Sequence, residues 1–121
     1  MSPMLTINRT VLIVTVRQPF VDWLRSLPDG GDSIGSITVD EVNEDCSAYL
    51  IPEFDTPEET ENYFGRNKSE LFEEALCGWH TDEALWPKRR SAKVFDEWFS
   101  VQFHTVVYDL DTRAPLAHDD D

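Results

Sequence analysis

Cysteine is scarce in this sequence, and the signals of export are missing. The chain of 121 residues holds two cysteines, Cys46 and Cys77. Two cysteines cannot build the disulfide framework that stabilises many small secreted domains. Residues 1–8 lack the charged and then apolar layout of a signal peptide, so we expect a cytoplasmic protein with both thiols reduced.

Long apolar runs and phosphate-binding glycine motifs are also missing. The apolar run at residues 11–16 is far shorter than the roughly 18 residues of a membrane span, so we expect no membrane partner. Walker and Rossmann glycine patterns do not occur. Residues 28–35, PDGGDSIG, contain three glycines, but the acids beside them would repel a phosphate. The segment therefore predicts a turn, and we expect no nucleotide cofactor.

Positive charge is scarce relative to negative charge in this chain. Ten Lys and Arg face twenty-four Asp and Glu, which gives a net charge of −14 at pH 7. Binding to a nucleic-acid backbone requires cations, so the charge argues against direct nucleic-acid binding. Eleven acids and no Lys or Arg lie between Arg25 and Arg66, whereas four of the ten cations gather within residues 88–93. The sequence predicts an acidic side and one small basic patch, although acidic surfaces often serve solubility alone.

Three segments have the pattern of β-strands. Residues 9–17 are apolar on both alternations and rich in β-branched side chains, which predicts a central strand covered on both faces. Residues 46–54 predict a second strand, which Pro52 ends. Residues 101–110 predict a third strand.

Helical patterns lie between these strands. The predicted helices span residues 18–28, 38–44, 56–78 and 91–99, and the last three begin at Thr38, Thr56 and Ser91 as capping residues. The order β-α-α-β-α-α-β describes a small three-stranded sheet packed with two longer and two short helices. It favours an α+β fold, with α/β as the alternative if the first crossover is parallel. We expect one domain at residues 9–110, between a flexible N-terminus at 1–8 and an acidic disordered tail at 111–121.

The segment 78–90, GWHTDEALWPKRR, combines two tryptophans, a histidine and three cations. Trp and Arg dominate protein–protein hot spots, and an aromatic ring beside guanidinium groups can bind an anion. The alternative is a linker in which Gly78 ends a helix, Thr81 caps a turn, and Trp79 and Trp86 are buried anchors. If the segment binds a partner, the candidate residues are Trp79, His80, Trp86, Lys88, Arg89 and Arg90.

Catalytic and metal-binding patterns are weak. Cys77 and His80 have C-x-x-H spacing, and Cys46 with His104 could complete four zinc ligands, but a structural zinc site normally shows two clustered pairs. Cys77 or Ser91 could meet a histidine as a nucleophile–base pair, yet no glycine-rich elbow or oxyanion motif accompanies them. We therefore expect no metal, cofactor or catalytic residue. A small enzyme or metal protein that uses Cys77, His80 and His104 remains an alternative.

Four segments of the chain form a recognisable set. They are VRQPFVDWLRSLPDGG, AYLIPEF, LFEEALCGWHTDEALWPKRR and FDEWFSVQFHTVVYDL. Together they resemble a family of small, acidic bacterial proteins of unknown function, over residues 9–110. The resemblance implies a bacterial cytoplasmic protein, and it carries no activity, cofactor or catalytic residue.

The function that these observations favour is binding without catalysis. We expect a cytoplasmic protein that binds another macromolecule, a protein in the first place, or itself as a homo-oligomer. No catalytic constellation accompanies the polarised acidic surface, and some of the fourteen aromatic residues can remain exposed for self-association. The other alternative is an acidic nucleic-acid mimic that occupies a basic groove of a DNA-binding protein with Asp40, Glu41, Glu44 and Asp45.

Overall fold

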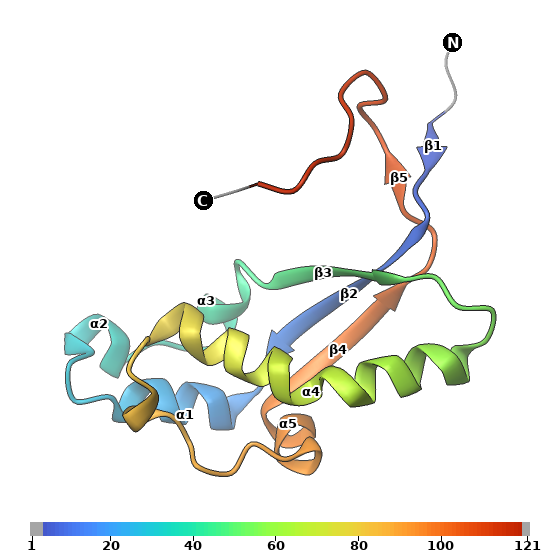
Figure 1. Ribbon diagram of the computed structural model, residues 1–121. Coiled ribbons are helices and arrows are strands. Elements are labelled where there is room, and N and C mark those ends of the chain that lie inside the picture. The colour runs from blue at the N-terminus through green and yellow to red at the C-terminus, as the bar shows by residue number, and fades with distance from the viewer. Residues whose placement is uncertain (1–3, 120–121) are drawn as a thin grey trace.

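A computed structural model of the chain describes residues 4–119 and shows a three-stranded antiparallel sheet (Figure 1). β2 (Arg9–Val16) lies in the centre, between β3 (Ser47–Pro52) and β4 (Phe99–His104). Leu12 of β2 pairs with Tyr49 on one side and with Phe103 on the other. The predicted α+β class is confirmed, whereas a parallel first crossover is wrong because β2 and β3 are antiparallel.

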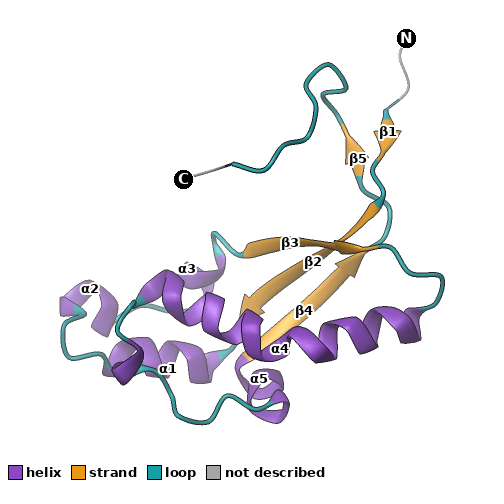
Figure 2. Ribbon diagram, in the orientation of Figure 1, coloured by secondary structure: helices purple, strands orange, loops and turns teal. Residues whose placement is uncertain are grey.

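The helices follow the predicted order with two additions, α2 and a 3₁₀ helix (Figure 2). They are α1 (Gln18–Ser26), α2 (Gly31–Gly35), α3 (Val39–Asn43), α4 (Pro57–Trp79), a 3₁₀ helix (Glu83–Leu85) and α5 (Ala92–Trp98). The short helix α2 replaces most of the predicted turn at 28–35. Gly31, its first residue, has a φ of 70°, which glycine adopts without steric cost and which reverses the chain after α1. α4 continues one residue beyond its predicted end at Gly78.

Capping side chains start three of the helices where the sequence predicted. Thr38 and Glu41 form both bonds of a capping box, and the Thr56 and Ser91 hydroxyls accept bonds from backbone amides of the first turn. The turn after α4 differs, because the Asp82 carboxylate caps the 3₁₀ helix and the predicted Thr81 does not.

All helices gather on one side of the sheet, and their contact with it is aromatic (Figure 1). Leu12 and Val14 of β2 are buried beneath Phe72 of α4 and Phe95 of α5. The Phe72 ring lies 5.1 Å from the Phe99 ring and 6.1 Å from the Phe95 ring, both edge to face. These rings form the centre of the hydrophobic core.

The opposite face of the sheet is only partly covered. Val11, Ile13 and Thr15 point to this outer face and are half-buried, and Leu50 beside them is 57% exposed. The prediction that β2 is covered on both faces is therefore wrong. No layer of the described chain covers this face (Figure 1). The apolar side chains of β2 are half-buried there because β2 is the central strand and the side chains of β3 and β4 flank it on both sides.

Two short strands extend the sheet as an arm. β1 (Leu5–Thr6) pairs with β5 (Tyr108–Asp109), and the Ile7 amide donates to the Val107 carbonyl over 2.9 Å. The predicted strand at 101–110 is thus interrupted after His104. Part of the segment 1–8, which we expected to be flexible, forms β1, while residues 1–3 and 120–121 lie outside the described range. Within residues 4–119, no helix is long and apolar enough to cross a membrane.

Phe72→Ala is expected to lower the free energy of unfolding by about 3–5 kcal/mol, because it removes a fully buried ring from the centre of the core. Phe54→Ala is the matched control, since the Phe54 ring is half-buried and packs on Tyr63 at the rim. The decrease in the free energy of unfolding should be clearly smaller for Phe54→Ala than for Phe72→Ala. Urea denaturation followed by circular dichroism measures both, and equal losses would contradict the central place of Phe72.

Candidate functional site

The segment predicted to bind a partner is largely fixed to the body of the protein. Trp86 is 8% exposed, and its indole N–H donates to the His80 carbonyl over 2.7 Å. The Trp23 indole N–H donates to the Leu85 carbonyl over 2.9 Å, which ties the segment to α1. Trp79, in contrast, is 41% exposed. The anchor interpretation is therefore confirmed for Trp86 and wrong for Trp79.

His80 connects the end of α4 to the turn that precedes α2. Its Nδ1 accepts the Asp82 amide over 3.1 Å, so the neutral ring carries its proton on Nε2, which lies 3.0 Å from an Asp29 carboxylate oxygen. The hydrogen bond from His80 is the main cause that lowers the pKa of Asp29 below its ordinary value of 3.8. Both ring nitrogens of His80 are thus engaged within the protein.

The basic residues of the segment divide into two kinds. The Arg90 guanidinium donates to the Pro87 carbonyl over 2.8 Å, lies 3.6 Å from the Glu73 carboxylate and stacks on the Trp86 ring at 5.8 Å. Arg90 therefore holds the segment to α4. Lys88 and Arg89 are exposed, and neither makes an ion pair within the described part of the chain.

The predicted binding residues do not line one shared pocket. Trp79 and His80 border a hollow of about 270 Å³ together with Leu24 and Leu27. Trp86 does not line this hollow, because its ring is buried in the core. The structure thus brings Trp79 and His80 together and leaves the exposed cations Lys88 and Arg89 outside.

The proposed zinc ligands are also apart. Cys77 and His80 lie at the end of α4, Cys46 precedes β3, and His104 ends β4 opposite Val11. No group of three or more His, Cys, Asp or Glu side chains in residues 4–119 is placed to hold a metal ion. The four-ligand set that the sequence suggested is not assembled.

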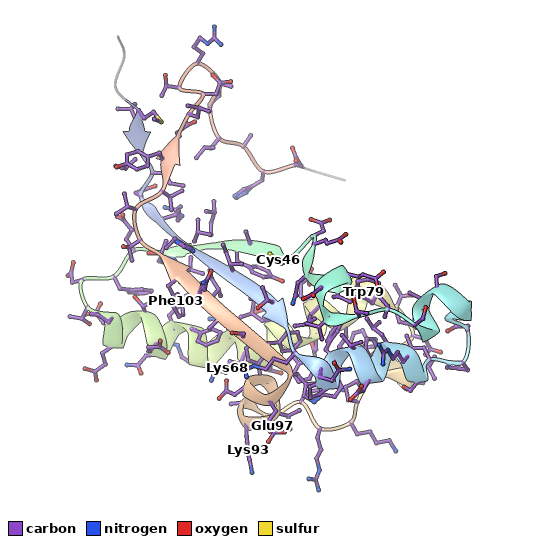
Figure 3. All side chains as sticks on the ribbon, turned by 180° about the vertical axis from the view of Figure 1, so that it is seen from behind. Cys46, Lys68, Trp79, Lys93, Glu97 and Phe103 are labelled. Atoms are coloured by element: carbon purple, nitrogen blue, oxygen red, sulfur yellow. The ribbon has the colours of Figure 1, made fainter. Side chains whose placement is uncertain are left out.

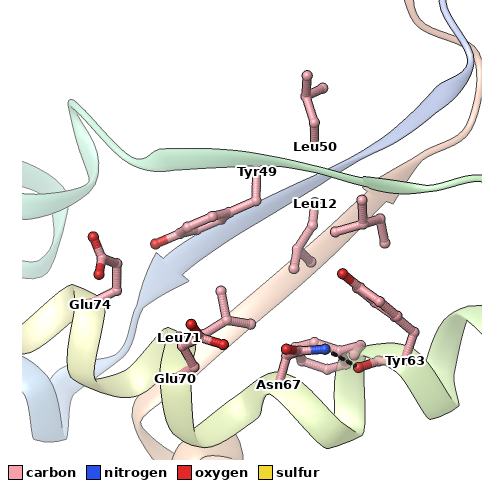
Figure 4. Close-up of a pocket in the computed structure, with 10 residues that line it drawn as sticks. Leu12, Tyr49, Leu50, Tyr63, Asn67, Glu70, Leu71 and Glu74 are labelled. Carbon is pink, nitrogen blue, oxygen red and sulfur yellow. Dashed lines mark hydrogen bonds between the residues drawn. The ribbon is translucent and has the colours of Figure 1, made fainter. Parts of the chain in front are cut away.

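A hollow between β3 and α4 forms a candidate site that the sequence analysis missed. Its volume is about 280 Å³, and Figure 4 shows it beneath the β3 strand. The buried side chains of Leu12 and Ile51 form its floor. Tyr49 extends from β3 toward α4, and Tyr63 extends from α4 toward β3 (Figure 4). The other lining residues are Leu50, Phe64, Asn67, Glu70, Leu71 and Glu74.

A second hollow of about 380 Å³ adjoins the first and shares Tyr49 and Glu74 with it. One wall is α3, which the Asn43 side chain fixes to the end of β2 by accepting the Val16 amide and donating to the Val16 carbonyl, over 2.8 and 3.1 Å. Trp79 lines the end of this hollow at the last turn of α4. We call the two hollows together the β3–α4 groove.

Negative charge surrounds the β3–α4 groove. Among the described residues, four carboxylates line it, those of Glu41, Asp45, Glu70 and Glu74, whereas no Lys, Arg or His does. The pKa of the Tyr49 phenol is raised, mainly because the phenol is partly buried. A hydrogen bond with Ser47 offsets part of this increase, and the Glu74 charge adds to it. The groove therefore combines an apolar floor with a negative rim.

The chemistry of the β3–α4 groove suits binding. Cys46 lines the second hollow near Trp79 (Figure 3), but no histidine within residues 4–119 lines either hollow to serve as its base. Aromatic walls and carboxylates match a partner that offers apolar and positively charged groups. The sequence contained a partial signal, because Tyr63, Asn67 and Glu70 recur at helical spacing beside the buried stripe of α4.

Comparison of the chain with protein-family models, with curated proteins and with solved structures gave no match.

Asp29→Asn should lower the urea midpoint near pH 6 and leave it unchanged at low pH. A carboxyl group with a lowered pKa in the folded state stabilises the fold fully above its ordinary pKa of 3.8. That contribution is lost as the pH falls through the lowered value. Midpoints of both proteins from pH 6 to pH 2 measure the effect. In a His80→Ala background the Asp29→Asn substitution should have little effect on the midpoint. An undiminished effect would contradict a stabilising hydrogen bond between His80 and Asp29.

Proposed function

We propose that this chain is a non-catalytic protein of the bacterial cytoplasm that binds another protein in the β3–α4 groove. The observation that carries the proposal is a groove of two adjoining hollows, which is lined by aromatic rings, apolar side chains and the carboxylates of Glu41, Asp45, Glu70 and Glu74. Both cysteines are free and exposed, which suits a reducing compartment. The resemblance of residues 9–110 to a family of acidic bacterial proteins supports a bacterial origin.

A macromolecular partner fits the groove better than a small molecule or a nucleic acid. Small-molecule sites enclose most of their ligand in one pocket, whereas here two separate hollows follow each other along β3 and share Tyr49 and Glu74. A nucleic-acid backbone requires cations, and none lines the groove. Tyrosine and tryptophan, which dominate protein–protein hot spots, line it at Tyr49, Tyr63 and Trp79.

A photo-crosslinking amino acid in place of Tyr63 should capture a discrete partner in bacterial cells, because Tyr63 projects into the groove. The control is the same substitution at Tyr108, which is 58% exposed on the arm. Glu70→Lys with Glu74→Lys should lower the yield at position 63 several-fold, since it reverses the charge of the rim. Equal adducts from positions 63 and 108, or no adduct from position 63, would contradict the proposal.

Self-association through another surface is a second candidate, and the distribution of exposed apolar side chains favours it. Leu5, Val106, Tyr108 and Leu110 are 57–82% exposed on or beside the β1–β5 arm, and Leu50 is exposed on the outer face of the sheet. A molecule of charge −14 repels a second copy except where uncharged surfaces meet. The outer face provides such a surface around Val11, Ile13 and Leu50.

Sedimentation equilibrium should detect a dimer whose association strengthens with salt, because salt screens the repulsion between two acidic copies. Leu50→Asp should weaken the dimer at least about tenfold by placing a charge on the outer face. Leu116→Asp, on an exposed side chain of the C-terminal segment, is the control and should have little effect. A monomer at every protein and salt concentration would rule out self-association.

A further inference from the structure

We propose that the β3–α4 groove binds its partner as an extended, lysine- or arginine-bearing segment that adds a fourth strand to the free edge of β3. This inference rests on the proposed function and specifies the chemistry and conformation of the partner. It depends on three features of the described residues: an open strand edge, two hollows beside it, and carboxylates without ion-pair partners.

The open edge belongs to β3. The sheet order is β3-β2-β4, and no other strand within residues 4–119 pairs with β3. Alternate residues of an edge strand direct their backbone N–H and C=O groups away from the sheet. Proteins usually protect such edges with charged side chains or proline, but Ser47 to Ile51 carry no charge, and Pro52 stands only at the end. The edge of β3 can therefore pair with a further strand.

The hollows provide room for side chains of an added strand. Side chains on one face of a strand recur every second residue, about 7 Å apart. The two hollows follow each other along β3 and share a wall at Tyr49 and Glu74. Figure 1 shows α4 running alongside β3 on the inner side of the sheet. An added strand can thus place alternate side chains in successive hollows, while its backbone pairs with β3.

The carboxylates determine which side chains fit. Asp45, Glu70 and Glu74 make no ion pair with another described residue. Lys and Arg bury an apolar stem and keep the charged group at the surface. In the first hollow the stem would lie against Leu71 and the phenol rings, and the charged group would reach Glu70 and Glu74. A segment with cations at alternate positions therefore matches both the floor and the rim.

The alternatives match less well. The chain's own C-terminal segment from Asp111 is rich in acids, so the rim repels it. A protein that mimicked nucleic acid would need its acids on an exposed surface, such as Asp40 and Glu44, and would not need apolar hollows. In that case a cationic partner would bind without regard to the strand edge or to Glu70 and Glu74.

The probe is a ten-residue peptide of alternating valine and lysine, titrated into the full-length protein. Trp79 reports binding, since it lines the groove and is 41% exposed, whereas Trp23 and Trp86 are each 8% exposed and the partly buried Trp98 packs against the core outside the groove. We expect saturable binding with protection of Trp79 from acrylamide quenching. The matching peptide of valine and glutamate should not bind.

Paired protein variants test the rim. Glu70→Gln with Glu74→Gln should weaken binding at least about tenfold. The control, Glu58→Gln with Glu97→Gln, removes the same charge from exposed positions outside the groove, and Glu97 lies on α5 (Figure 3). It should change affinity less than about twofold, apart from the weak general effect of net charge. Equal weakening by both variants would overturn the proposal and favour diffuse binding to the acidic surface.

Two further peptides test the strand pairing by N-methylation of alternate lysine amides or alternate valine amides. Only one set of alternate amides can face β3. One N-methylated peptide should therefore lose binding, and the other should retain it. Equal behaviour of both would overturn strand addition. Absence of peptide binding, with crosslinking from position 63 intact, would overturn this inference and leave the proposed function standing.

Discussion

The contact of Phe72 with Phe95 and Phe99 is the interaction on which the rest of the structure depends. It holds α4 and α5 against the inner face of the sheet, because Phe72 lies on α4, Phe95 lies on α5 and Phe99 begins β4. Within residues 4–119 the helices lie on one face of the three-stranded sheet (Figure 1), and no further strand pairs with the outer edges of β3 and β4.

The position of α4 explains why a groove forms beside β3. Phe64, Phe72 and Leu76 point into the core and are almost fully buried. The next stripe of the same helix, which includes Tyr63 and Glu70, faces β3 across the groove. The aromatic contacts of Phe72 fix α4 against the sheet, so the position of the groove wall follows from the core. Under the proposed function, charge would then select the partner, since the Asp45, Glu70 and Glu74 carboxylates make no ion pair with another described residue.

The local pattern of the sequence predicted much of the fold. Thr38, Thr56 and Ser91 begin helices as their capping chemistry requires, and β2 was recognised as the central strand from its β-branched residues. The uncovered outer face was not predictable, because the half-buried Val11 and Ile13 have the same apolar pattern as fully buried residues. The order of the strands depends on long-range pairing, which local patterns do not encode.

The site was less predictable than the fold. Trp86 and Arg90 were conspicuous in the sequence, but they stack on one another and hold the segment to α4. The groove residues Tyr49 and Tyr63 stand 14 positions apart on separate elements, and only folding brings them together. A spacing rule along one segment cannot detect such a pair. The polar stripe of α4 was detectable, but it resembled an ordinary solvated helix face.

Amide hydrogen exchange of β3 measures the central claim, that the partner binds at the strand edge in the β3–α4 groove. The exchange rates of Ser47 to Ile51 would be compared in the free protein and in the protein saturated with the valine–lysine peptide. The account predicts slower exchange at alternate amides of β3. If the Tyr49 amide faces the added strand, the amides of Ser47, Tyr49 and Ile51 slow and those of Ala48 and Leu50 change little. If the Ala48 and Leu50 amides face it, those two slow and the other three change little. Unchanged exchange along β3, with protection only at α3 or on the outer face, would contradict it.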